Sequence, residues 1–261
     1  MKDHPLLPYA LHPDTCEQLS VEAYRKAFGH LSSASQPPAL CPICGECVEL
    51  VRAHDRAQTL HFSHPSRLAE PCPLVSALVP DTLAQTSIPR DPARELKARG
   101  LFLDKWVWHF QRVRELAPAY SIERFTRGIA HADVLHIWAC EALEQSDIPY
   151  LFLALAGSMI ASAETPRIWF RFWFDSSVQA VSDLHGPRDM PARLYRLRYR
   201  NVQPGRFPET RHLTDWTEIP MTSEFLNGDA PRIMSGEKQT FQAFLNRRSG
   251  SDRDEAFELE A

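Results

Sequence analysis

Cysteine and histidine residues in the first third of the chain have the spacing of metal ligands. The motif Cys41-Pro-Ile-Cys44 is followed by His61-Phe-Ser-His64 and then by Cys72. A tight turn between two cysteines separated by two residues lets both thiolates reach one ion, and Zn²⁺ prefers four such ligands in a tetrahedron. The sequence therefore predicts a zinc site in which Cys41, Cys44 and Cys72 are joined by a histidine.

The second half of this site has alternatives. His64 is expected to bind the ion, with His61 orienting it or replacing it, and Cys72 would complete a set of three cysteines and one histidine. If both histidines bind with the first two cysteines, Cys72 is an ordinary thiol. Cys47 could also compete as a ligand of the ion. In the remaining interpretation no metal is bound, and the cysteines are buried thiols while the histidines lie on the surface. Four protein ligands leave no open position on the ion, so the zinc is expected to be structural.

Four segments share their pattern with a known family. They are Ala10-Leu11-His12-Pro13-Asp14-Thr15, Ser20-Val21-Glu22-Ala23, Cys41 to Glu46, and His61 to His64 with a trailing cysteine. Over roughly residues 9 to 74, the chain resembles the N-terminal zinc-binding module of the CoiA-like competence family. The resemblance implies a bacterial DNA-uptake, mobile-element or defence setting, and a following nuclease domain of the restriction-endonuclease type.

The carboxylates that such a nuclease needs do not occur in the expected pattern. An Asp at one strand end and a Glu-x-Lys or Glu-x-Gln on the next strand would hold Mg²⁺ beside the scissile phosphate. The nearest candidates, Asp133, Glu141 and Glu144, lie in a stretch whose pattern predicts a helix. A non-catalytic protein is therefore expected, and a divergent metal-dependent nuclease that uses these carboxylates is the alternative.

Composition places the chain among ordinary globular proteins. It has 261 residues, of which 44% are apolar and 24% are charged. No signal peptide and no membrane-spanning run is recognised, so a cytoplasmic location without membrane association is expected. Six cysteines in such a compartment indicate metal ligands or free thiols rather than disulfides. The net charge of −4 is carried by the acidic C-terminal segment, so the rest of the chain is close to neutral.

Proline-rich and polar stretches divide the chain into four parts. We expect a zinc-binding module at 1–78, a linker at 79–90, a larger domain at 91–248 and an acidic disordered tail at 249–261. The predicted fold class is α+β, with a small zinc-stapled β-rich N-terminal module and a domain of helices and antiparallel sheet. Predicted strands lie at 9–12, 48–52 and 59–62, and predicted helices at 20–29, 91–116, 121–143 and 239–247, while 147–163 could be helix or strand.

Alternation of side chains predicts two strands at 168–174 and 194–200. If they pair, aromatic and basic side chains form an outer surface on which indoles stack on bases and guanidinium groups hold phosphates. The predicted nucleic-acid-binding residues are Trp169, Arg171, Trp173, Arg196, Arg198 and Arg200. In a second interpretation the arginines pack over the tryptophans and pair with acids. In a third, exposed tryptophans dock a partner protein.

Overall fold

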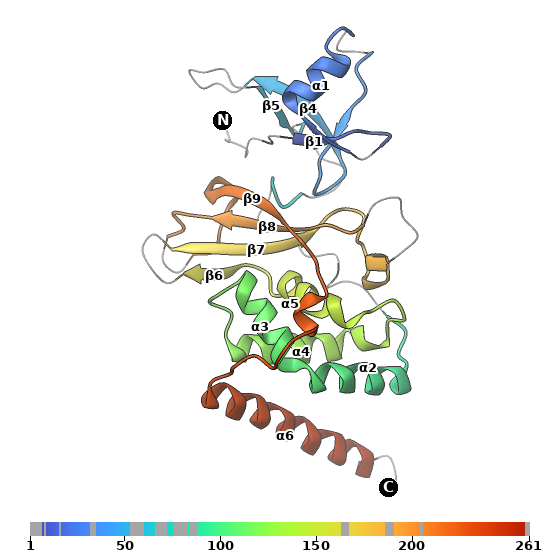
Figure 1. Cartoon of the computed structure of the whole chain (residues 1–261), viewed down its shortest axis with the longest axis vertical. Helices are drawn as coiled ribbons and strands as arrows, with labels where there is room; N and C mark the ends of the chain where they lie inside the picture. The colour runs from blue at the N-terminus through green and yellow to red at the C-terminus, as the bar shows by residue number, and fades with distance from the viewer. Residues whose placement is uncertain are drawn as a thin grey trace.

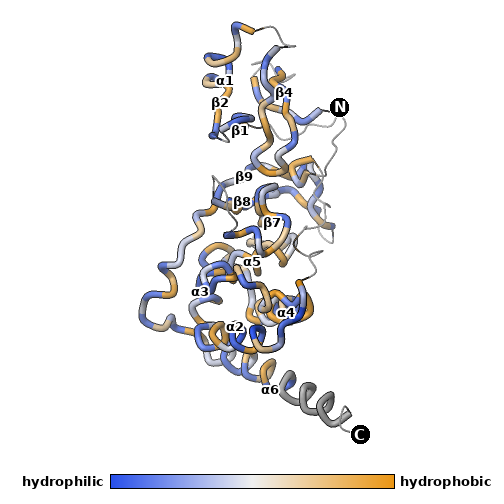
Figure 2. The backbone as a smooth tube through the Cα atoms, turned by 90° about the vertical axis from the view of Figure 1, so that its right-hand side faces the viewer, coloured by the Kyte–Doolittle hydropathy of each residue, from blue (hydrophilic) through white to orange (hydrophobic). Residues whose placement is uncertain are grey.

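The protein is built in three layers, which Figure 1 shows from top to bottom. The computed structural model describes residues 7, 9–15, 17–31, 35–52, 60–65, 72–75, 83, 88–162, 167–185, 191–203 and 206–258. These residues form six α-helices and two antiparallel β-sheets, so the predicted α+β class is confirmed. An N-terminal module lies on one face of the second sheet, helices cover the other face, and Figure 2 shows the same order from the side.

The N-terminal module is a five-stranded sheet of order β2-β1-β3-β4-β5 with one helix. The Oγ of Ser20 accepts a hydrogen bond from the backbone N–H of Ala23 at 3.1 Å, which caps the first turn of the helix as the sequence predicts. The elements are β1 (Tyr9–Leu11), β2 (Gln18–Ser20), α1 (Val21–Phe28), β3 (Ala39–Leu40), β4 (Cys47–Arg52) and β5 (Leu60–Ser63).

The helical layer begins at Asp91, whose side chain accepts from the backbone N–H of Arg94 at 3.1 Å. The single helix predicted for 91–116 is wrong, because the chain breaks at Lys105. Phe102 before the break and Phe110 after it are both buried in the core of the helical layer. The helices are α2 (Pro92–Asp104), α3 (Trp106–Leu116), α4 (Ile122–Val134), α5 (Ile148–Leu155) and α6 (Ser235–Glu258).

The helix predicted for 121–143 is shorter than expected. It ends at Val134, and His136 has a φ of 52°, in the left-handed region that stops a helix. The left-handed residue redirects the chain into the short 3-10 helix η3 (Ile137–Ala139), where Trp138 is buried. The segment that could be helix or strand contains α5, followed by β6 (Met159–Ser162).

The predicted linker and tail are described only in part. Within 79–90, Leu83 is buried in the core of the helical layer, while 79–82 and 84–87 lie outside the described residues. α6 has its last residue at Glu258, within the predicted tail, and the remaining three residues are outside the described part. None of the described helices combines the length and the apolar composition needed to cross a membrane.

The second sheet separates two apolar cores. It has the order β6-β7-β8-β9, with β7 (Ile168–Phe174), β8 (Leu194–Tyr199) and β9 (Leu213–Ile219), and every neighbouring pair is antiparallel. Phe172 and Phe174 pack with the helices, whereas Trp173 and Tyr195 pack with the N-terminal module. Because successive side chains of a strand point to opposite faces, β7 and β8 serve both cores at once.

Candidate metal centre

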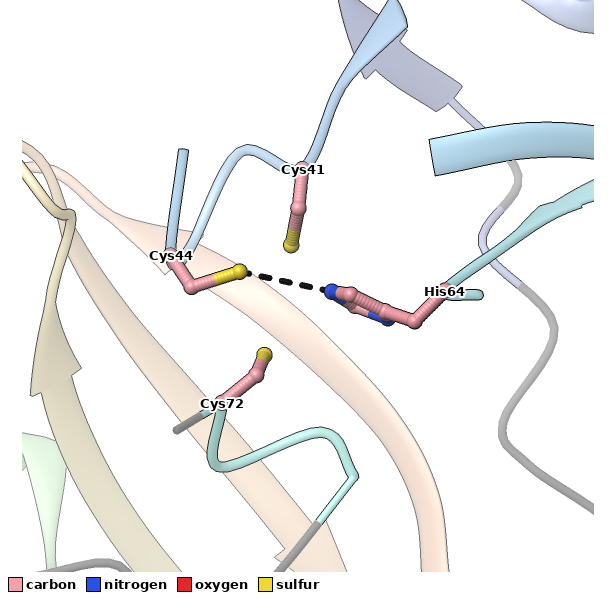
Figure 3. A group of neighbouring side chains, drawn as sticks. All are labelled: Cys41, Cys44, His64 and Cys72. Atoms are coloured by element: carbon pink, nitrogen blue, oxygen red, sulfur yellow. Dashed lines mark hydrogen bonds between the residues drawn. The ribbon is translucent and has the colours of Figure 1, made fainter. Parts of the chain in front are cut away.

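Four predicted ligands meet in the N-terminal module, as Figure 3 shows. They are Cys41, Cys44, His64 and Cys72, and one ligand atom from each lies within 4.8 Å of all the others. Four ligands about 2.0–2.3 Å from a central Zn²⁺ would lie about 3–4 Å from one another, so the spacing suits one tetrahedral ion. The described residues therefore contain a group that could hold a metal ion.

The first pair of ligands is set by a turn between β3 and β4. The N–H of Gly45 donates to the carbonyl of Cys41 at 2.9 Å, and the N–H of Cys41 donates to the carbonyl of Glu46 at 2.8 Å. Gly45 has a φ of 72°, which favours glycine. Ile43 inside the turn is fully buried and anchors it. The turn aims the thiols of Cys41 and Cys44 at the same place.

The second pair arrives from two later segments. His64 directly follows β5, and its Nε2 lies 3.3 Å from the Sγ of Cys44. Cys72 is buried and opens a turn in which the N–H of Val75 donates to the carbonyl of Cys72 at 2.9 Å. Ligands from three separate segments therefore converge on one point, which is typical of a structural metal site.

The surroundings shift the pKa values of the three thiols in different directions. Burial raises the pKa of the Cys41 thiol and, most strongly, that of the Cys72 thiol. Hydrogen bonds from Cys41 and then Cys72 lower the pKa of the Cys44 thiol. A divalent ion would stabilise all three thiolates, including those of Cys41 and Cys72, which burial disfavours.

His61 and Cys47 do not belong to this group. His61 is a buried residue of β5 opposite Val51, and Cys47 is an exposed residue of β4 opposite Leu40. His61 lies within β5, whereas His64 lies just beyond its end, and of the two only His64 has a ring nitrogen within the group of ligand atoms. The group of two cysteines and two histidines is therefore not assembled, and the set that meets contains three cysteines and His64.

The residues predicted to bind nucleic acid are divided between the two faces of the second sheet. The register pairs Phe172 with Arg196 and Phe170 with Arg198, and directly paired residues lie on the same face of a sheet. Arg196 and Arg198 are therefore on the face toward the helices, while Trp169, Arg171 and Trp173 are on the face toward the module.

The contacts of these side chains follow from their faces. Arg171 is 6% exposed, and its guanidinium carbon lies 4.6 Å from the ring centroid of Trp173. Arg196 lies 4.7 Å from the ring centroid of Phe170, and the Nε of Arg198 lies 2.8 Å from the carboxylate of Asp215. Packing over rings and pairing with acids are the contacts that the second interpretation expects.

The carboxylates of the nuclease alternative are engaged elsewhere. Asp133 accepts hydrogen bonds from the Nε of Arg99 at 2.9 Å and the Nε1 of Trp138 at 2.7 Å. Glu141 has an 88% exposed side chain, and Glu144 caps the short 3-10 helix η4 (Gln145–Asp147). Among the described residues, the three carboxylates do not form a group of metal ligands.

A basic hollow beside the sheet was not expected from the sequence. It has a volume of about 270 Å³ and lies where the chain passes from β8 to β9. Next to it, Phe207 is 68% exposed, and its ring meets the ring of Trp169 edge-on with 6.0 Å between centroids. The neighbouring pairs Arg206-Phe207 and Arg211-His212 are the signal that could have indicated it. Gln203, Arg206, Glu209, Arg211 and His212 line the hollow.

Fold and site together define an α+β protein with a cluster of three cysteines and one histidine beside the packing surface of two units. The chain matches no protein-family model, no curated protein and no solved structure at a significant level.

Proposed function

We propose that Cys41, Cys44, His64 and Cys72 bind one Zn²⁺ and that this ion has a structural role in a non-catalytic protein. The observation that carries the proposal is the gathering of their four ligand atoms within 4.8 Å. Thiolate and imidazole ligands are those that Zn²⁺ prefers, and four of them leave no position for water or substrate. Hydrolysis at the ion is therefore not part of the proposed role.

The ion would stabilise the turn between β3 and β4 and also the packing of the module on the second sheet. Cys41 and Cys72 belong to the same buried cluster as Trp173, Tyr195 and Tyr199 of the second sheet. Three residues after Cys72, the carbonyl of Val75 accepts a hydrogen bond from the Oγ1 of Thr210 at 2.8 Å. A ligand that fixes the segment from Cys72 to Val75 thus also fixes a contact between the two units.

Metal analysis of the purified full chain tests this proposal. We expect one zinc ion per chain in the natural protein and in Cys47→Ser, whose thiol is exposed and outside the group. Cys41→Ser and Cys72→Ser should each lose most of the zinc, because a structural site depends on every ligand. Absence of zinc from the natural protein, or full zinc content in Cys41→Ser, would contradict the proposal.

Nucleic-acid association is the second candidate function, supported by the basic hollow. Arg206 and Arg211 are exposed guanidinium groups that suit phosphates, and exposed Phe207 offers a ring on which a base can stack. Arg211 also pairs with Glu209 of the same lining at 3.1 Å, so a phosphate would have to replace or share this carboxylate. Two of the six predicted residues contact residues in or next to the hollow: Trp169 contacts Phe207, and the N–H of Arg200 donates to the carbonyl of His212 at 2.8 Å. The resemblance to CoiA-like modules supports a DNA-uptake, mobile-element or defence setting.

Fluorescence anisotropy with labelled single-stranded and duplex oligonucleotides tests this function. Binding should weaken steeply with added salt, and the double substitution Arg206→Ala with Arg211→Ala should lower the salt slope by about 2, one for each phosphate contact. Arg94→Ala, which removes a partly exposed arginine of the helical layer, is the matched control. Absence of binding, or binding that does not change with salt, would contradict the phosphate contacts that this function requires.

A further inference from the structure

A second cluster of titratable side chains lies in the larger domain, outside the metal centre. Asp147 ends η4, and His185 ends the 3-10 helix η5 (Val181–His185). The Nε2 of His185 lies 3.0 Å from Oδ1 and 2.9 Å from Oδ2 of Asp147. Oδ2 also accepts the N–H of Glu144 at 2.8 Å. The carboxylate is thus held by two segments that are far apart in the sequence.

The exposed member of this pair is the histidine. The side chain of Asp147 is 11% exposed, whereas that of His185 is 39% exposed. A ring nitrogen that faces a carboxylate carries a proton, so the neutral imidazole has its lone pair on Nδ1, at another position on the ring. In its neutral form, His185 therefore offers a hydrogen-bond acceptor on a ring that is fixed by a buried carboxylate.

The pair lies in the wall of a cavity of about 280 Å³. Its described lining includes two carboxylates, those of Glu144 and Asp147, and no lysine or arginine. Leu184 and Met221 provide apolar wall. The floor is fixed, because the hydroxyl of buried Tyr150 accepts the N–H of Thr222 at 2.8 Å and donates to the carbonyl of the same residue at 3.0 Å. The Nε of Arg112 also donates to this hydroxyl at 3.3 Å, and its charge is paired with Glu115 outside the lining. A concave site with few polar groups on a rigid floor is typical of small-ligand binding.

We propose that this cavity binds a small organic cation whose N–H groups donate to the Nδ1 of His185 and to the carboxylate of Glu144. Its apolar part packs against Leu184 and Met221. Hydrogen bonds between a cation and a carboxylate are about twice as strong as neutral ones, so the negative lining selects against anions of the same shape. The site has no role in the proposed zinc binding or nucleic-acid association.

Benzamidine and benzoate are suitable probes, because they share a ring and a planar head group but carry opposite charges. The experiment uses the full metal-loaded chain with ¹³C-labelled histidine rings, and the His185 signal is assigned by its loss in His185→Gln. Glutamine keeps an N–H donor for Asp147 and removes the imidazole. Benzamidine should shift the His185 signal in a saturable manner, and benzoate should not.

Glu144→Gln provides a second measurement that does not depend on the histidine. It keeps the side-chain oxygen that caps η4 while removing the charge. The affinity for benzamidine should fall about tenfold, as expected for a lost charge-assisted hydrogen bond. The proposal is overturned if benzamidine gives no saturable shift of His185, if benzoate binds equally well, or if Glu144→Gln leaves the affinity unchanged.

Discussion

At the scale of single residues, His109 is a titratable group placed inside the helical layer. Its side chain is 0% exposed, and its ring centroid lies 5.0 Å from that of Phe102 and 5.6 Å from that of Phe225. Burial lowers the pKa of His109 to about 3. In the unfolded chain this imidazole has an ordinary pKa of about 6.5. Between that pH and about pH 3, the imidazole is therefore neutral in the folded protein but protonated in the unfolded chain.

This difference makes folding stability depend on pH. Below about pH 6.5 the unfolded state binds a proton that the folded state does not, so stability falls by about 1.4 kcal/mol per pH unit. Between pH 8 and pH 5 the loss attributable to His109 is about 2 kcal/mol. We expect urea unfolding of His109→Gln to show a correspondingly smaller loss over this range than the natural protein. Equal losses in the two proteins would contradict the assignment.

At the scale of elements, the turn between β3 and β4 serves two purposes. It presents Cys41 and Cys44 to the metal site, and its Gly45 also approaches the larger domain. A Cβ at Gly45 would lie 2.6 Å from the Oγ of Ser176, which follows β7. The turn is therefore in contact with the chain segment beyond the sheet, and glycine is required both by its φ of 72° and by this approach.

Gly157 provides a matched control for a substitution in this turn. It also has a positive φ, of 63°, but a Cβ there would meet nothing within 4 Å. Gly157→Ala should cost only the strain of a left-handed alanine, about 1–2 kcal/mol, whereas Gly45→Ala should cost more in urea unfolding. Adding Ser176→Gly should remove the excess, because the obstructing hydroxyl is gone. Equal costs for both alanines would show that the approach to Ser176 is unimportant.

The elements also show what local pattern can and cannot predict. Alternation in 168–174 and 194–199 correctly predicted strands and correctly divided Trp169 and Phe170 between two faces. The register between the strands depends on distant residues, so the face of Arg196 could not be read from the sequence. The burial of Trp173 could not be read from the sequence either, because the module that packs on it lies about 100 residues earlier in the chain.

The candidate site was easier to predict than the fold around it. Cys41 and Cys44 are fixed by a local turn, and soft ligands at that spacing have a specific chemistry. The choice between His61 and His64 depends on how β5 is placed against the turn, which is tertiary information. Asp147 belongs to the local capping box of η4, but its meeting with His185 depends on the tertiary fold, which brings η5 to η4.

At the scale of the whole molecule, the module and the larger domain share a core. Tyr9 of the module lies 4.7 Å from Trp216 of β9 between ring centroids, and the Nε2 of Gln18 donates to Glu218 at 3.4 Å. The face of the sheet that carries Trp173 is covered by this contact. Loss of the proposed zinc should therefore destabilise the second sheet as well as the module.

Hydrogen exchange after treatment with a zinc chelator measures this coupling. Amides in β7 and β8 should exchange faster when the ion is removed, because the docked module no longer protects them. Cys72→Ser should give the same pattern without chelator, and Cys47→Ser should exchange like the natural protein. If faster exchange is confined to 39–52 and 60–65, the ion stabilises the module alone.

The shared core has a consequence for the order in which the protein is synthesised. Cys72 leaves the ribosome about 130 residues before Tyr199, the buried aromatic residue that lies in the same cluster. At translation rates of roughly 5–20 residues per second, the interval is about 6–25 s. During this time the apolar face of the module is uncovered and its thiols are open to oxidation. Early binding of the metal would protect the thiols of the nascent chain before the second sheet, on which the module packs, has been synthesised.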